Sequence, residues 1–211
     1  MRRLFGRSLV ALVCGLAVAT LVGTGTTTAA AATPADLGVT LQPTPGGDAG
    51  QCGGPRSQWV VEGDWTNPVR FDTDGRAGGC LLAFGIRDQA DVLHGLNVIF
   101  TWQNSPNGDI GQCGNRGTFG FPITTGLATS PFVGVDTDDR SGWCNLSFTL
   151  SGRTDVALDV QWFADGDGGQ CKNALPAGQY QTALNGVTIG IGDDTDGRPG
   201  GCQLMMRLRQ F

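Results

Sequence analysis

The sequence predicts an all-β fold made of three tandem, disulfide-stapled repeats, each of about sixty residues. Three observations predict it. Two short motifs occur three times in the same order, cysteines recur in step with them, and apolar and polar residues alternate beside each motif. Together they favour one pseudo-threefold domain of four-strand repeats, of the β-trefoil or β-prism kind, over three separate units.

The two motifs are G-D-x-G-Q-C and D-T-D-x-R-x-G-x-C. The first spans 47–52, 108–113 and 166–171, and the second spans 72–80, 136–144 and 194–202. Chance does not place two ordered strings three times in one chain. The motifs therefore predict the organisation of the chain: repeat 1 is 33–94, repeat 2 is 95–155 and repeat 3 is 156–211.

Six of the seven cysteines occupy equivalent positions, two in each repeat; the seventh, Cys14, lies in the N-terminal signal and is expected to be removed with it. An even number in an exported chain favours three disulfides. Zinc binding is disfavoured, because the cysteine spacings are long, no C-x-x-C occurs and His94 is the only histidine. Since equivalent copies should close equivalently, we expect the pairs Cys52–Cys80, Cys113–Cys144 and Cys171–Cys202.

Alternating apolar residues predict four strands in each repeat, two outside and two between the motifs. Strands before the first motif are expected at 37–41, 96–102 and 158–162, and strands after the second at 80–86, 144–150 and 202–208. Polar residues, among them Arg207 and Arg209, alternate with the apolar ones in the last group and are expected on the outer face. Of the two strands between the motifs, one carries an aromatic residue and the other leads into the aspartate-rich loop. The aromatic residues are Trp59, Phe119 and Tyr180, and the strands that lead into the loop contain Val69, Val133 and Val187.

The first 32 residues have the pattern of a secretory signal peptide. Arg2 and Arg3 begin a basic start, an apolar run follows from Leu9 to Val22, and small residues end at Ala32, after which we expect cleavage. A membrane anchor is disfavoured because the apolar run is shorter than the roughly twenty residues that span a bilayer. The sequence therefore predicts a secreted protein without a membrane span in its mature part.

The charge of the chain argues against nucleic-acid partners. Without the arginines of the signal, 11 basic residues face all 19 acidic ones, a net charge of about −8. Phosphate backbones are bound by neutralising them with Lys and Arg, so such a surface repels them. Of the acids, 18 are Asp, which with 35 Gly favours turns over helices. The excess of Arg over Lys fits a GC-rich bacterial genome.

The second motif is the main candidate for metal binding. Alternating carboxylates in a glycine-rich loop can surround calcium, which takes six to eight oxygen ligands. The alternative is a structural clamp, in which Arg76, Arg140 and Arg198 each bind an aspartate beside the disulfide; ligand recognition is the third possibility. Calcium is thus the one cofactor expected, with the candidate ligands Asp72, Asp74, Asp136, Asp138, Asp194 and Asp196.

Differences between the repeats indicate where a ligand binds. Trp143 stands where the sister motifs have Gly79 and Gly201, and Asp139 replaces a glycine beside Arg140. Trp65 has no counterpart in the other repeats. Because Trp and Arg are enriched in binding hot spots, we expect Trp143, Arg140, Asp139 and Trp65 to contact a ligand; simple packing of Trp143 over its disulfide is the alternative.

These patterns favour a binding protein over an enzyme. Nucleophile-and-base pairs usually need a histidine, and His94 lies between repeats 1 and 2 without an equivalent. The expected function is a secreted, non-catalytic, lectin-like module that engages a carbohydrate or cell-surface ligand through its acidic repeat loops. The alternative is a structural or adaptor subunit that docks onto another exported protein.

Overall fold

The alternating segments of the sequence fold as antiparallel β-strands, as expected for an all-β protein. The structure is a computed structural model that describes residues 34–47, 49–72, 78–106, 111–136, 142–166, 168–194 and 200–211. These ranges contain sixteen strands, two 3-10 helices and no α-helix. The predicted signal peptide, 1–32, lies outside the described residues.

The strands follow the repeats. Repeat 1 contains β1 (Asp36–Pro43), the 3-10 helix η1 (Ala49–Gln51), β2 (Cys52–Gly53), β3 (Ser57–Val61), β4 (Val69–Asp72) and β5 (Gly79–Asp88). Repeat 2 contains β6 (Asn97–Asn104), β7 (Cys113–Gly114), β8 (Gly117–Pro122), β9 (Gly126–Thr129), β10 (Val133–Asp136) and β11 (Trp143–Ser151). Repeat 3 contains β12 (Val156–Gly166), η2 (Gly168–Gln170), β13 (Cys171–Lys172), β14 (Gln181–Ala183), β15 (Thr188–Asp194) and β16 (Gly200–Gln210).

The four predicted strands of each repeat are present, with differences at their edges. Tyr180 lies just before β14 rather than in it, and Val187 precedes β15. Repeat 2 adds β9, and a two-residue strand begins at the first cysteine of every repeat. These pairings are too short to leave a period-two pattern, so the sequence does not reveal them.

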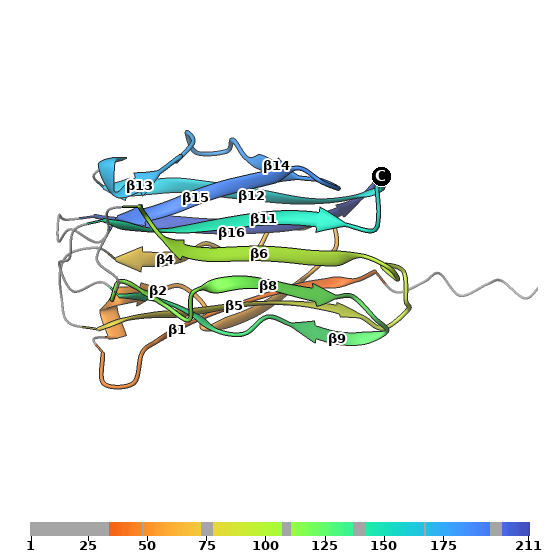
Figure 1. The fold of residues 1–211 in the computed structure, drawn as a ribbon, viewed down its shortest axis with the longest axis horizontal. Helices are drawn as coiled ribbons and strands as arrows, with labels where there is room; N and C mark the ends of the chain where they lie inside the picture. Colours follow the sequence, from red (N-terminus) through yellow and green to blue (C-terminus); the bar gives the residue numbers. More distant parts are fainter. Residues whose placement is uncertain are drawn as a thin grey trace, which may run out of the picture. The chain divides into compact units, whose positions relative to one another are not determined.

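The strands form three sheets, here called A, B and C (Figure 1). Sheet A has the order β3-β1-β5-β10-β7, with β9 also paired to β5; sheet B has β14-β12-β16-β4-β2; sheet C has β13-β15-β11-β6-β8. In each sheet, three neighbouring strands come from one repeat and the remaining strands come from another. Repeat 1 thus contributes strands to the main sheet of repeat 3, repeat 2 to that of repeat 1, and repeat 3 to that of repeat 2. We call the strands that lie in the main sheet of another repeat the exchanged strands.

Buried hydroxyls connect two of the exchanged strands to the sheets that they join. Thr66, before β4, accepts a hydrogen bond from the main-chain N–H of Met206 at 2.9 Å, and its own N–H donates to the Met206 carbonyl. Ser130, before β10, makes the same reciprocal pair with Phe84 at 2.8 Å. Met206 and Phe84 are equivalent residues of β16 and β5. The same connection is therefore made twice, between different repeats.

The inward-facing residues of the three sheets form one apolar core. Alternation along β11 is complete, with each second side chain buried. Phe84 of sheet A contacts Phe100 and Phe148 of sheet C edge-on, with ring centroids 5.7 and 5.1 Å apart. Met206 and Leu208 of sheet B line the same interior. Burying this apolar surface is the main stabilising contribution to the fold.

Residues 32–211 form one unit, so the repeats are not separate bodies. Within the described residues, no helix is both long and apolar enough to cross a membrane.

Candidate functional site

One disulfide joins the two cysteines of each repeat, which confirms the predicted pairing. Their Cα–Cα distances are between 5.6 and 5.7 Å: Cys52–Cys80, Cys113–Cys144 and Cys171–Cys202. Because the first cysteine of each pair lies on an exchanged strand at the edge of a sheet, every bridge connects two sheets. The bridges join sheet B to A, A to C, and C to B.

The cysteines also form a continuous ring through the β-ladders. Val135 of β10 is paired with both Cys80 and Cys113. In the same way, Asp193 is paired with Cys144 and Cys171, and Phe71 with Cys202 and Cys52. Disulfides and ladder pairs therefore alternate in a closed circuit, which we call the cysteine belt. All three copies of the second motif begin and end beside this belt.

Backbone conformation explains why two positions, one in the second motif and one just after the first, carry the same kind of residue in every repeat. The glycine two residues before the second cysteine has φ of 120° in Gly78, 109° in Gly142 and 136° in Gly200, a region that side chains disfavour. Two residues after the first cysteine, φ is also positive. Glycine or asparagine, the residues that tolerate it best, stand there in every repeat: Gly54, Asn115 and Asn173.

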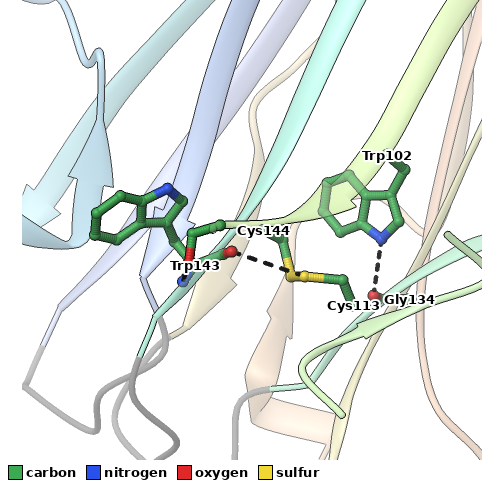
Figure 2. Close-up of a disulfide and its surroundings, with 6 residues drawn as sticks. Trp102, Cys113, Gly134, Trp143 and Cys144 are labelled. Atoms are coloured by element: carbon green, nitrogen blue, oxygen red, sulfur yellow. Dashed lines mark hydrogen bonds between the residues drawn. A yellow bond between two sulfur atoms is a disulfide. The ribbon is translucent and has the colours of Figure 1, made fainter. Parts of the chain in front are cut away.

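Trp143 lies at the edge of the cysteine belt, next to Cys144 and across the disulfide from Trp102 (Figure 2). The Nζ of Lys172, the only lysine of the chain, is 4.1 Å from the centre of the Trp143 ring, a cation–π contact between repeats 2 and 3. Trp143 and Lys172 line an open cavity of about 450 Å³, together with Ser105, Pro106 and Gly142.

The main chain of Trp143 lies in the same position relative to its disulfide as the main chains of Gly79 and Gly201 do. Its carbonyl oxygen is 3.8 Å from the Sγ of Cys113, and the carbonyls of Gly79 and Gly201 are 3.3 Å from the equivalent sulfurs. The fold therefore needs only the main chain at this position. The indole is an addition of repeat 2, and it is half-buried against Lys172 rather than part of the core.

Most predicted metal ligands fall outside the described residues. This applies to Asp74, Asp138 and Asp196, and also to Asp139 and Arg140 of the predicted ligand-binding set. Asp136 and Asp194 end β10 and β15, and only their main chains are described. Asp72 is buried, with Oδ2 3.5 Å from Nη1 of Arg70. Within the described parts of the chain, no three His, Cys, Asp or Glu side chains gather as a metal site.

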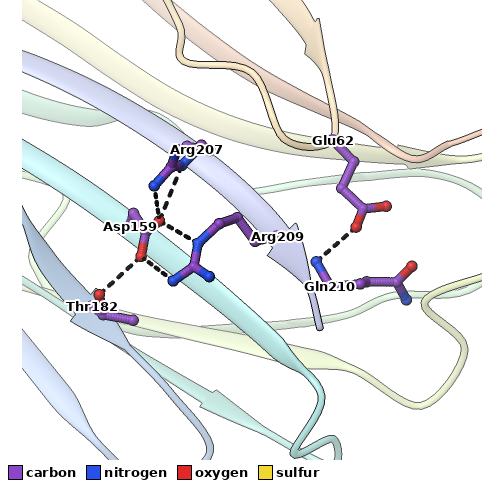
Figure 3. Close-up of polar contacts among 6 residues, drawn as sticks. All are labelled: Glu62, Asp159, Thr182, Arg207, Arg209 and Gln210. Carbon is purple, nitrogen blue, oxygen red and sulfur yellow. Dashed lines mark hydrogen bonds and ion pairs between the residues drawn. The ribbon is translucent and has the colours of Figure 1, made fainter.

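The outer face of sheet B carries a buried carboxylate that holds two arginines (Figure 3). Asp159 of β12 has no solvent exposure. Its Oδ2 accepts from Nε and Nη2 of Arg207 at 3.1 and 2.8 Å, and from Nε of Arg209 at 2.6 Å. Its Oδ1 accepts from Nη2 of Arg209 at 3.1 Å and from the Thr182 hydroxyl at 2.8 Å.

These contacts decide the charge of Asp159. Burial by itself raises the pKa of a carboxyl, but the hydrogen bonds from Arg209, Arg207 and Thr182 outweigh it and lower the pKa of Asp159 below its ordinary value. Hydrogen bonding to Asp159 likewise raises the pKa of Arg209. Asp159 is therefore ionised at neutral pH, and the group of one carboxylate and two guanidinium ions carries a net charge of +1.

Trp65 and Tyr180 lie beside this group. Their rings meet edge-on with centroids 5.6 Å apart, and the guanidinium carbon of Arg207 is 4.5 Å from the Trp65 ring and 5.3 Å from the Tyr180 ring. Tyr180 remains 43% exposed. Trp65, between β3 and β4, thus lies beside the outer face of sheet B, whereas Trp143 begins β11 of sheet C. Among the described residues, no hydrogen bond or ring contact joins these two predicted ligand-binding residues.

The equivalent outer faces of the other sheets differ. On sheet A, Trp59 lies flat on Gly38 and Gly85, where a Cβ at either glycine would collide with its ring. Arg87 stacks on Trp59 at 4.4 Å and pairs with Asp36 at 3.3 Å, so that face has one cation for one anion. Sheet C instead presents hydroxyl pairs: Thr101 with Thr118, and Thr149 with Thr188.

Sequence reasoning missed Asp159, Arg207 and Arg209 as a group. The two arginines were expected only as polar positions on the outer face of the last strand. One signal was available: Asp159 is the only charged residue in the apolar run 156–160, and two arginines alternate with apolar residues on the last strand. His94, the other titratable candidate, lies exposed with Nδ1 3.3 Å from Oδ1 of Asp91.

The described groups are suited to binding, because fixed cations beside aromatic rings can hold a ligand that offers a negative charge and an apolar face. Comparison of this chain with protein-family models, with curated protein sequences and with solved structures finds no match.

Proposed function

We propose that this chain is a secreted, non-catalytic, lectin-like module that binds a carbohydrate at the cysteine-belt end of the fold, where the repeat loops begin. The observation that carries the proposal is the cavity of about 450 Å³ at which Trp143 lies over Lys172. The apolar face of a sugar ring packs well on an indole, and an ammonium group can donate to its hydroxyls.

The cyclic exchange of strands supports the idea of a β-prism-like, pseudo-threefold scaffold for this role. Every sheet combines strands of two repeats, and every sheet pair is stapled. A rigid scaffold of this kind lowers the entropic cost of presenting a site. The differences between repeats then provide the specificity, since the shared parts of the repeats are explained by the fold. Export through the predicted signal agrees with the three disulfides, which persist in oxidising compartments.

A glycan array tests the proposal, using the mature protein and the variants Trp143→Gly and Lys172→Gln. We expect both variants to lose binding at least tenfold while keeping the melting temperature, because glycine already occupies the sister positions of Trp143. The matched control is Leu127→Ala, which removes an exposed apolar side chain from β9. Retention of glycan binding by both variants, or failure of the intact protein to bind any glycan, would refute the proposed site.

The alternative function, an adaptor subunit in an exported complex, is favoured by one other surface. Leu127 and Phe132 on the β9–β10 segment are 59% and 38% exposed. Exposed apolar side chains that gather on one surface are typical of a protein–protein contact, and these two lie five residues apart in the chain. Co-purification from culture medium tests this alternative: a partner lost on Leu127→Ala but kept on Trp143→Gly would support it, whereas an intact protein recovered without a partner would oppose it.

A further inference from the structure

The outer face of sheet B has the composition of a second ligand site, distinct from the cavity beside Trp143. We propose that Arg207, Arg209 and Tyr180 bind a carboxylate-bearing sugar, such as a uronic acid residue of an acidic polysaccharide. The proposal is independent of the first site, because it rests on residues of β16 and of the segment before β14.

The first argument is local charge. Ten of the 19 acidic residues lie within the two repeated motifs, so the net acidity of the chain belongs mainly to these motifs. On the outer face of sheet B, one buried carboxylate serves two arginines. Asp159 already accepts five hydrogen bonds and has no exposure, so it cannot bind a ligand itself. The uncompensated positive charge favours an anion.

The second argument is preorganisation. Each arginine uses Nε and Nη2 for Asp159, and among the described residues neither Nη1 donates to a protein acceptor. Arg207 is also fixed between two rings, and its side chain is only 20% exposed. Since the side chains are already ordered, a carboxylate can bind them with little further loss of entropy.

The third argument concerns the kind of ligand. Exposed rings flank the arginines: Tyr180 is 43% exposed, and Phe211, 68% exposed, lies 5.9 Å from the Arg209 guanidinium. A pyranose ring bearing a carboxylate offers an apolar face for these rings and a charge for the arginines. An acidic peptide that binds as an added strand would need a free strand edge. The edge strand here, β14, has three residues and offers little of one.

The matching group on sheet A provides the control. There Arg87 also stacks on a tryptophan, but it is neutralised by its own aspartate, Asp36. If stacked arginines alone were enough for binding, the two faces would be equivalent. If the uncompensated charge is needed, only the face of sheet B binds.

The experiment is a titration of the mature protein with oligogalacturonate, with its methyl ester as the uncharged match. We expect oligogalacturonate to bind and its ester to bind at least tenfold more weakly. Arg209→Gln and Tyr180→Ala should each weaken oligogalacturonate binding about tenfold, which is 1.4 kcal/mol. Arg87→Gln should leave it unchanged. Loss of oligogalacturonate binding in Trp143→Gly but not in Arg209→Gln would place the acid in the cavity of the proposed function and overturn the inference.

Several results would overturn the inference. One is that the acid binds no better than its ester, and another is that Tyr180→Ala, which leaves the ion pairs intact, binds as the parent protein does. Equal loss in Arg87→Gln would show that the neutral face serves as well. Binding of polyglutamate as tight as that of oligogalacturonate would show that the ligand is an acidic peptide or any polyanion rather than a sugar. Melting curves of each variant separate loss of binding from loss of folding.

Discussion

A carboxylate without solvent exposure organises the outer face of sheet B. Asp159 stands on a strand whose sister positions are Gly38 and Ile99, so neither of the other repeats needs a charge there. Burial of an ion is costly unless its charge and its lone pairs are matched. Two guanidinium groups and a hydroxyl match them here, and the same contacts hold Arg207 and Arg209 in the positions that the proposed sugar site requires.

At this scale the sequence showed residue types but not partners. It predicted that Arg207 and Arg209 face outward, because they alternate with buried leucines and a methionine along β16. It could not predict that both converge on Asp159, because that contact depends on the register of β12 against β16, in which Asp159 is opposite Arg207. The roles of Arg140, Asp139 and most loop aspartates stay predictions for the same reason, since their partners come from outside their own segment.

The first prediction concerns Asp159→Asn. Breaking a buried ion group by removing one partner should lower the free energy of unfolding by about 3 kcal/mol at pH 7. The folded-state pKa of Asp159 is lowered, so its contribution is present above the unfolded-state pKa of about 4 and is lost as pH falls through the folded value. The stability difference between parent and variant should therefore shrink below pH 4, as measured by urea unfolding from pH 7 to pH 2.5.

The control for that experiment is Asp36→Asn, which breaks the half-exposed pair with Arg87. A pair of this kind contributes about 0–1 kcal/mol. A loss at Asp36 as large as at Asp159, or a difference at Asp159 that does not change with pH, would contradict the account.

At the scale of elements, the important feature is the crossing of β4, β10 and β15 into a sheet of another repeat. The alternating pattern predicted that these strands exist, because Val69, Val133 and Ile191 mark their buried faces. It did not predict which sheet each would join. Alternation specifies which side of a strand is buried, but a short strand fits any sheet edge with an apolar inner face. The hydroxyls of Thr66 and Ser130 supply part of the missing information.

The second prediction tests these hydroxyls. Thr66→Val keeps the shape of the side chain but leaves the N–H of Met206 without its acceptor, in a buried site. We expect a loss of about 1–3 kcal/mol in the free energy of unfolding. Ser130→Ala should cost a similar amount through Phe84. Thr101→Val, which removes an exposed hydroxyl pair with Thr118, is the control and should change stability by less than about 0.5 kcal/mol.

The third prediction concerns the loops between β4 and β5, β10 and β11, and β15 and β16. If the predicted ligands Asp74, Asp138 and Asp196 bind calcium, millimolar calcium should raise the melting temperature and a chelator should lower it, because a ligand stabilises the state that binds it. If the arginine clamp is correct instead, calcium should have no effect. Arg76→Ala, Arg140→Ala and Arg198→Ala should then each destabilise by about 1–3 kcal/mol.

At the scale of the whole molecule, the cysteine belt explains how three small repeats become one unit. Each repeat is too short to bury a large core alone, and the exchanged strands let all three repeats share one apolar core. The disulfide pairing could be predicted because repetition removed the ambiguity of six cysteines. The closure of the belt could not, since it depends on Val135, Asp193 and Phe71 pairing with cysteines of two repeats each.

The last prediction follows from the place of the cysteines in the belt. Cys113 lies on the two-residue strand β7, which is held to sheet A by only two ladder pairs with β10. Its disulfide to Cys144 of β11 connects that strand covalently to sheet C. Replacing Cys113 and Cys144 by alanine opens a chain loop of 31 residues, for which the loss should be about 3–4 kcal/mol. Hydrogen exchange should then speed up at β7 and β10, where the A–C connection is cut, while the centres of β12 and β16 stay protected. Replacing Cys171 and Cys202 should move the fast exchange to β13 and β15, because that bridge ties sheet C to sheet B. The same exchange pattern in both variants would mean that the belt acts only through the entropy of the unfolded chain and does not hold particular sheet pairs together.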